Sequence, residues 1–102
     1  MQTAVKSLNQ IAQEIDDYIH SGGGGYSSWY VGIASDPRAR LFNDHNVNEM
    51  NDSWIYRDCG SDTSARKVEE YFIGKGCKGG TGGGDYTARY VYAYKISRNT
   101  IE

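Results

Sequence analysis

The sequence predicts a small α+β domain in which a three-stranded sheet is flanked by helices. Three stretches have the aromatic and β-branched composition of strands, namely "SSWYVGIAS", "SWIYRD" and "ARYVYAYKI". Stretches with helical periodicity lie before, between and after the first two of them. A chain of 102 residues is long enough for one core and too short for two. We therefore expect a single domain over residues 1–102, with the helices packed on the sheet.

The N-terminal stretch has the pattern of an amphipathic helix over residues 3–20. Its apolar residues recur at three- and four-residue steps, at Val5, Leu8, Ile11, Ala12, Ile15, Tyr18 and Ile19. Thr3 is a suitable N-cap, and the run "SGGGG" ends the helix. We expect this helix to cover one face of the sheet.

The first strand, within residues 27–35, leads into a helix start. Asp36 can cap the helix and Pro37 suits its first turn, so a helix should run to about His45. The loop "NVNEMND" then leads to the second strand, "SWIYRD". These elements open the core that carries the sequence motifs, residues 28–73.

The second half should contain a helix, a glycine-rich loop and a last strand. Asp62 or Thr63 can cap the helix, which continues through "SARKVEEYFI" and stops at Gly74. The loop over residues 74–85 contains G-x-G-x-x-G, but the motif follows a helix and precedes a strand. A dinucleotide fingerprint needs the reverse order, so we interpret this stretch as a flexible loop. Residues 87–96, with alternating tyrosines, should form the last strand.

Composition limits the possible function classes. No apolar run approaches the roughly 18 residues of a membrane span, and the N-terminus lacks a signal-peptide pattern, so we expect a cytoplasmic protein that does not enter the membrane. Two cysteines without metal-ligand spacing predict free thiols rather than a zinc site. The net charge of -2 argues against an overall basic surface. The bases are nevertheless clustered in sequence, which leaves a local nucleic-acid cleft open.

Glu69 occupies an unusual position on the predicted helix 64–73. At about 100° per residue, it falls inside the apolar arc, whereas Glu70 lies on the polar side. The arc consists of Ala65, Val68, Tyr71, Phe72 and Ile73. A carboxylate on a core-facing stripe is unfavourable unless it is paired, hydrogen-bonded or bound to a cation. Glu69 therefore needs a partner, either an arginine of a neighbouring element or a metal ion.

Candidate partners come from "WYVGIASDPRARLFNDHN". Tyr30 and Gly32 lie at the exit of the strand, Arg40 in the following helix and His45 at its end. Together with a metal-binding carboxylate, such residues suit phosphodiester cleavage. The cation and arginine neutralise charge on the phosphate while tyrosine or histidine handles the proton of water. Each also has an ordinary explanation: a sheet aromatic, an Arg40–Asp44 ion pair and a cation at a helix C-terminus.

These stretches resemble the GIY-YIG nuclease signature. The family has a tyrosine-(Ile/Val)-glycine strand followed by a helix with an arginine, and Arg40 stands ten positions after Tyr30. "SWIYRD" resembles the middle strand of the family. "ARKVEEYFI" resembles its Ala-x-x-x-Glu helix, which makes Glu69 the counterpart of the metal-binding glutamate. The resemblance covers about residues 28–73.

The resemblance implies a GIY-YIG-like sandwich with an added N-terminal helix, and a small endonuclease acting on DNA or RNA. Tyr30, Arg40, His45 and Glu69 would be catalytic, and Glu69 would hold one Mg²⁺ or Mn²⁺. The substrate-binding residues we expect are Gly32, Arg38 and Lys67. The alternative is a catalytically inactive module of the same fold that binds or inhibits a nucleic acid or a protein partner.

The first strand of the family, Gly-Ile-Tyr, has no counterpart before Tyr30. That region reads "SGGGGYSS", and Tyr26 is too close to Tyr30 to lie on a separate hairpin strand. The C-terminal "RYVYAYK" could take this place, because its three tyrosines alternate and so share one face. Tyr92, at the centre, is then the expected catalytic tyrosine, within hydrogen-bond reach of Tyr30, His45 or a bound phosphate. The alternative is a plain edge strand with aromatic packing.

Overall fold

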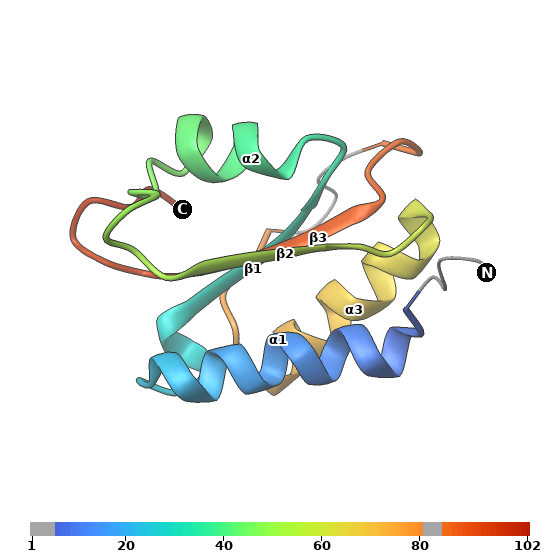
Figure 1. The fold of residues 1–102 in the computed structure, drawn as a ribbon, viewed down its shortest axis with the longest axis horizontal. Coiled ribbons are helices and arrows are strands. Elements are labelled where there is room, and N and C mark those ends of the chain that lie inside the picture. The colour runs from blue at the N-terminus through green and yellow to red at the C-terminus, as the bar shows by residue number, and fades with distance from the viewer. Residues whose placement is uncertain (1–5, 81–84) are drawn as a thin grey trace.

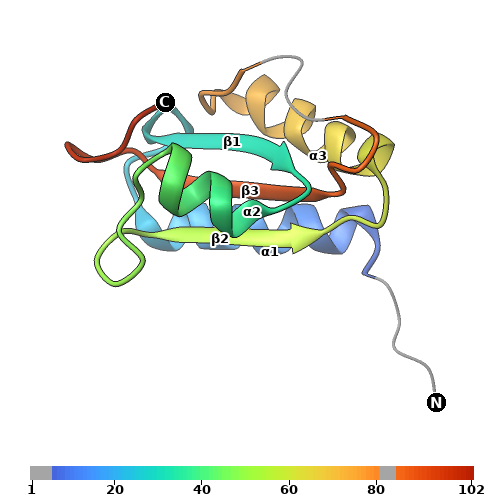
Figure 2. The same ribbon diagram turned by 90° about the horizontal axis from the view of Figure 1, so that it is seen from above.

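The computed structural model describes residues 6–80 and 85–102 and contains one antiparallel sheet with the strand order β1-β3-β2. Both outer strands pair antiparallel with β3 (Figure 2). The α+β class predicted from the sequence is confirmed. In chain order the elements are α1 (Leu8–Gly22), the 3₁₀ turn η1 (Tyr26–Ser28), β1 (Trp29–Ala34), α2 (Pro37–Ala39), the π-helical turn η2 (Arg40–Asp44), β2 (Trp54–Asp58), α3 (Asp62–Lys75) and β3 (Tyr90–Lys95).

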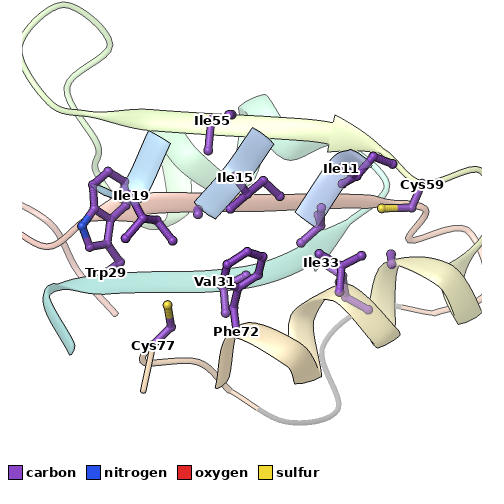
Figure 3. Packing of buried hydrophobic residues seen from close by; sticks show 14 of the residues in the cluster. Ile11, Ile15, Ile19, Trp29, Val31, Ile33, Ile55, Cys59, Phe72 and Cys77 are labelled. Atoms are coloured by element: carbon purple, nitrogen blue, oxygen red, sulfur yellow. The ribbon is translucent and has the colours of Figure 1, made fainter. Parts of the chain in front are cut away.

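The helices form a layer on each side of the sheet. Helices α1 and α3 lie on one side, and α2 lies on the other (Figure 1). The larger core fills the space between the sheet and the α1/α3 layer, where Ile15, Val31 and Phe72 are fully buried (Figure 3). A smaller cluster beneath α2 contains Leu41 and Tyr94. The two faces of the sheet therefore have different chemistry, because the strand tyrosines point toward α2.

Helix α1 begins later than the sequence pattern predicts. Ser7 is the N-cap, and its side chain accepts a hydrogen bond from the Gln10 backbone N–H. The predicted cap Thr3 lies outside the described residues, but Lys6 and Ser7 are not helical, so a helix starting at residue 3 is wrong. The predicted apolar face is present, because its isoleucines at positions 11, 15 and 19 are buried.

The segment after β1 has the predicted capping but an unexpected interior. Asp36 accepts a hydrogen bond from the Ala39 N–H, and α2 then widens into η2. The helical path ends at His45, as predicted, and the His45 N–H donates to the Arg40 carbonyl. Short π-helical turns occur often at functional sites. The backbone of this turn positions Arg40 and His45, which lie at its start and just after its end.

Helix α3 is capped by Ser61, not by the predicted Asp62 or Thr63, and it continues one residue past Gly74. Its C-cap, Gly76, has φ 121°, which favours glycine. Tyr71, predicted to face the core, is 46% exposed, because the helix presents Ala65, Val68, Glu69 and Phe72 to the sheet instead.

Part of the predicted glycine-rich loop is attached to the sheet. Lys78 forms a parallel bridge with β1, in which its N–H donates to Trp29 O and its carbonyl accepts from Val31 N. A side chain at Gly79 would approach the Val31 carbonyl to 2.9 Å, so this close passage requires glycine. Residues 81–84 of that loop lie outside the described part. In the described part no helix is both long and apolar enough to cross a lipid bilayer.

Candidate active site

The last strand occupies the centre of the sheet, so the prediction of a plain edge strand is wrong. Strand β3 lies directly beside β1, with Tyr94 opposite Tyr30 and Tyr92 opposite Gly32. The Tyr92 ring crosses the Gly32 backbone so closely that an added Cβ at Gly32 would be 2.5 Å from the hydroxyl oxygen. The absence of a side chain at position 32 therefore creates the space that the Tyr92 hydroxyl fills.

Three tyrosines and one histidine make a compact cluster under η2. The Tyr30 ring is 4.7 Å from His45 and stacks with Tyr94 at 5.3 Å and with Tyr92 at 6.5 Å, measured between ring centroids. His45 Nε2 lies 2.7 Å from the Tyr92 hydroxyl, and His45 Nδ1 lies 2.7 Å from the Ile101 carbonyl oxygen. Tyr92 and His45 are thus within hydrogen-bond distance of each other, as the sequence predicts.

Burial controls the protonation of this cluster. His45 is 4% exposed and Tyr92 is 1% exposed. Burial lowers the pKa of His45, which the Ile101 hydrogen bond partly offsets, and favours the neutral imidazole. Burial raises the pKa of Tyr92 and Tyr94, so both phenols stay protonated. The prediction of His45 as a cation at a helix end is not what this environment favours.

Arg40 is the cationic group beside the cluster. Its charge lowers the pKa of both His45 and Tyr92, which places the guanidinium within electrostatic range of both. The predicted pair with Asp44 exists, at 3.1 Å from Arg40 Nε to Asp44 Oδ2, but this contact lacks the alignment of a hydrogen bond. Arg40 also borders a hollow of about 160 Å³ at the end of β1. The hollow is also lined by Asp36 and Asp85, and the Arg40 Nε that lacks a hydrogen bond is buried.

Glu69 is buried at 4% exposure, as the helical pattern predicts. Burial raises the pKa of its carboxyl, Glu70 raises it further and Arg66 opposes them. Helix α3 covers the face opposite α2 but packs along the edge strand β1, and the charge of Glu69 raises the pKa of Tyr92. Glu69 therefore lies on the α3 side of the sheet, opposite the cluster, and its charge acts on Tyr92 from there.

The sequence predicts Glu69 as the ligand of a divalent cation, and carboxylate oxygens are ligands that Mg²⁺ prefers. Within residues 6–80 and 85–102, no group of three or more His, Cys, Asp or Glu side chains is arranged to hold a metal. A cation bound there would have Glu69 as its single protein ligand, with the remaining positions left to water and substrate oxygens.

Two of the predicted substrate contacts lie apart from this cluster. Lys67 borders a groove between α1 and α3, together with Asp16 and Tyr71. Arg38 stacks over Phe42 at 5.0 Å and forms an ion pair with Glu49. The structure brings together Tyr30, Gly32, His45 and Tyr92, with Arg40 beside them, whereas Glu69 lies on the opposite side of the sheet.

Two participants of the cluster could not be ranked from the sequence. Tyr94 was one of three tyrosines on the same strand face, and only its hydroxyl position, 3.1 Å from His45 Nδ1, shows that it belongs here. The Ile101 carbonyl has no sequence signal, because backbone groups carry none. Comparisons with protein-family models, curated proteins and solved structures found no match to this chain.

Proposed function

We propose that this chain is a small GIY-YIG-type endonuclease that cleaves phosphodiester bonds in DNA or RNA with one Mg²⁺ or Mn²⁺. The observation that carries the proposal is the 2.7 Å contact between the Tyr92 hydroxyl and His45 Nε2. A tyrosine hydrogen-bonded to a neutral imidazole can pass on a proton, which hydrolysis of a phosphodiester requires. A cytoplasmic location agrees with the two free cysteines, Cys59 and Cys77.

The roles follow from where each side chain lies. Arg40 binds the scissile phosphate, because it borders the hollow at the end of β1 and its charge offsets that of the phosphate. A water molecule gives its proton to the Tyr92 oxygen while the Tyr92 proton moves to His45 Nε2. The oxygen of that water then bonds to phosphorus as the bond to the leaving oxygen breaks. The leaving oxygen takes up a proton from solvent water, so that one phosphomonoester and one alcohol form, and His45 Nε2 then releases its extra proton to solvent.

Tyr30 contributes at the rim of the cluster. It is less buried than Tyr92, and its ring packs against both His45 and Tyr94. Its hydroxyl can orient the water or contact the phosphate. A divalent cation at Glu69 would supply positive charge to the phosphate and acidify water. In this scheme Gly32 has no side chain, which leaves room for the Tyr92 ring beside the β1 backbone.

The burial of Tyr92 favours a second candidate function. A hydroxyl on a residue with 1% exposure is closed to solvent in the free protein, and an inactive module of the same fold would have such a sealed cluster. That module would hold a nucleic acid or a protein through Arg40 and the neighbouring surface. The two candidates differ in whether phosphodiester bonds are broken.

A cleavage assay separates them. Single- and double-stranded DNA and RNA are incubated with the protein and Mg²⁺, Mn²⁺ or a chelator. We expect metal-dependent cleavage that Tyr92→Phe lowers by about 10² to 10⁴-fold, because that variant loses only the hydroxyl. The matched control is Tyr71→Phe, which removes a hydroxyl from an exposed ring bordering the α1/α3 groove and should leave the rate unchanged. Binding without cleavage of any substrate supports the inactive module.

A further inference from the structure

The C-terminal segment is fastened to both sides of His45. The Ile101 N–H donates to the His45 backbone carbonyl at 2.7 Å, and the Ile101 carbonyl lies 2.7 Å from His45 Nδ1. One residue on, the side chain of Asn46 donates to Asn99 O at 2.9 Å, and the side chain of Asn99 donates to Asn46 O at 3.1 Å. The segment thus pairs with the histidine backbone and also contacts its ring.

The short ring contact fixes which imidazole nitrogen carries the proton. A carbonyl oxygen can only accept, so the 2.7 Å contact requires a proton on His45 Nδ1. A neutral imidazole has one N–H, which leaves Nε2 as an acceptor, and the Tyr92 hydroxyl must then donate to it. In the other tautomer Nδ1 would accept from the Tyr94 hydroxyl at 3.1 Å, but its lone pair would also face the carbonyl lone pairs at 2.7 Å, which is repulsive. The Tyr94 hydroxyl can instead donate to the Ile101 carbonyl at 3.2 Å.

The charges around the ring come from every neighbouring element. Arg40 and Asp44 lie on η2 and Glu102 on the C-terminal segment, and their charges all act on His45. The rings of Tyr30 of β1 and of the tyrosines 92 and 94 of β3 pack on the imidazole. Buried among them, the imidazole stays neutral before a proton arrives.

We infer that the Ile101 carbonyl is a positioning group that holds His45 in the Nδ1–H tautomer and thereby directs proton transfer from Tyr92 to His45 Nε2. When Nε2 takes the proton, the imidazolium keeps its Nδ1–H bond to the carbonyl, which stabilises the new charge. The tautomer follows from the contacts alone, whereas its catalytic consequence rests on the proposed nuclease function.

Asn46 and Asn99 hold the segment that carries the Ile101 carbonyl, and neither side chain does so through the imidazole ring of His45. Asn46 has φ 56°, a backbone region that asparagine tolerates, and this turns its side chain toward the segment. Asn99 also donates to Asp52 Oδ2 at 2.8 Å, which ties the segment to the loop before β2. Removing the Asn99 side chain should therefore loosen the Ile101 carbonyl without changing any group of the cluster.

The test is long-range ¹H–¹⁵N NMR of the imidazole nitrogens near pH 7. The chain has only two histidines, and exposed His20 serves as the internal reference. We expect His45 with a protonated Nδ1 and an unprotonated Nε2. Asn99→Ala and a chain ending at Arg98 should both shift His45 toward the other tautomer or a mixture. Arg98→Ala, a change at an exposed position of the same turn, should leave the spectrum unchanged.

The outcomes are separable. A protonated Nε2 in the unaltered protein, or a tautomer that neither Asn99→Ala nor the shortened chain changes, overturns the inference. If cleavage occurs, Asn99→Ala should lower kcat about 10-fold or more with little change in KM, and Arg98→Ala should not. The expected spectra without any cleavage refute the nuclease proposal and leave the tautomer assignment in place.

Discussion

Gly32→Ala is the sharpest test of how the cluster is built, because the effect of one methyl group follows directly from the coordinates. The new Cβ would lie 2.5 Å from the Tyr92 hydroxyl oxygen and 2.6 Å from Cζ, while ordinary contact begins at 3.4 Å. The groups must separate by roughly 0.9 Å. Since Gly32 has no positive φ, its backbone accepts alanine, and the whole effect comes from packing.

Tyr92 has little freedom to give way, because its ring is 1% exposed and its hydroxyl is bonded to His45. Overpacking a rigid core costs about 1–3 kcal/mol. For a domain of this size each kcal/mol lowers Tm by about 4–8 °C. Differential scanning calorimetry measures this shift, and NMR reports the Tyr92–His45 bond through the Nε2 resonance. Both should change in Gly32→Ala.

Gly74→Ala is the matched control. It lies in α3, an added Cβ there meets no atom within 4 Å, and alanine is favoured over glycine in a helix by about 0.5–1 kcal/mol. Its Tm should stay the same or rise. If Gly32→Ala melts like the unaltered protein and keeps the Nε2 resonance, then Tyr92 does not lie against Gly32 and the described cluster is incorrect.

Three further outcomes test the remaining groups. Because burial raises the pKa of Glu69, its ionisation weakens the fold as the pH rises above about 4.5. Glu69→Gln should therefore abolish cleavage, while its Tm matches or exceeds that of the unaltered protein at pH 7.5 and the gain in Tm vanishes near pH 4. A large loss of Tm would indicate a structural ion pair. Arg40→Ala should abolish cleavage but lower the free energy of unfolding by at most about 1 kcal/mol in a denaturant titration, because the ion pair with Asp44 is partly exposed. If cleavage survives, Arg40 is not part of the site. Burial lowers the pKa of His45, so the free energy of unfolding should decline as the pH falls from 6.5 toward 5. His45→Gln should lack this decline. An equal decline in both proteins would assign the titration to another group.

The elements that the sequence predicts well are those determined by local chemistry. Asp36 and Pro37 start α2 as expected, because a cap and a first-turn proline act within one turn. The buried position of Glu69 also follows from helical period alone. The start of α1 does not, since Ser7 and Thr3 are both residue types that cap helices well and the helical period does not choose between them.

The predictions that fail depend on long-range packing. Tyr71 and Phe72 are neighbours on α3, and the helical period cannot decide which one the sheet covers. Lys67 points into the α1/α3 groove because α1, an element outside the resemblance, packs beside it. The Ile101 carbonyl reaches His45 across 56 residues, a contact that no local pattern contains.

The position of β3 explains why the cluster depends on register more than on motif order. Strands β1 and β2 share no hydrogen bonds, because β3 lies between them, so Tyr30 meets the C-terminal tyrosines only through the β1–β3 pairing. Side chains on a strand alternate between faces, and a shift of β3 by one residue would turn the tyrosines toward the α1/α3 core. His45 would then lose both hydroxyl contacts, while every short motif in the sequence would remain intact. A nuclease assignment for this chain therefore depends on the pairs Tyr30–Tyr94 and Gly32–Tyr92, which join residues more than 55 positions apart.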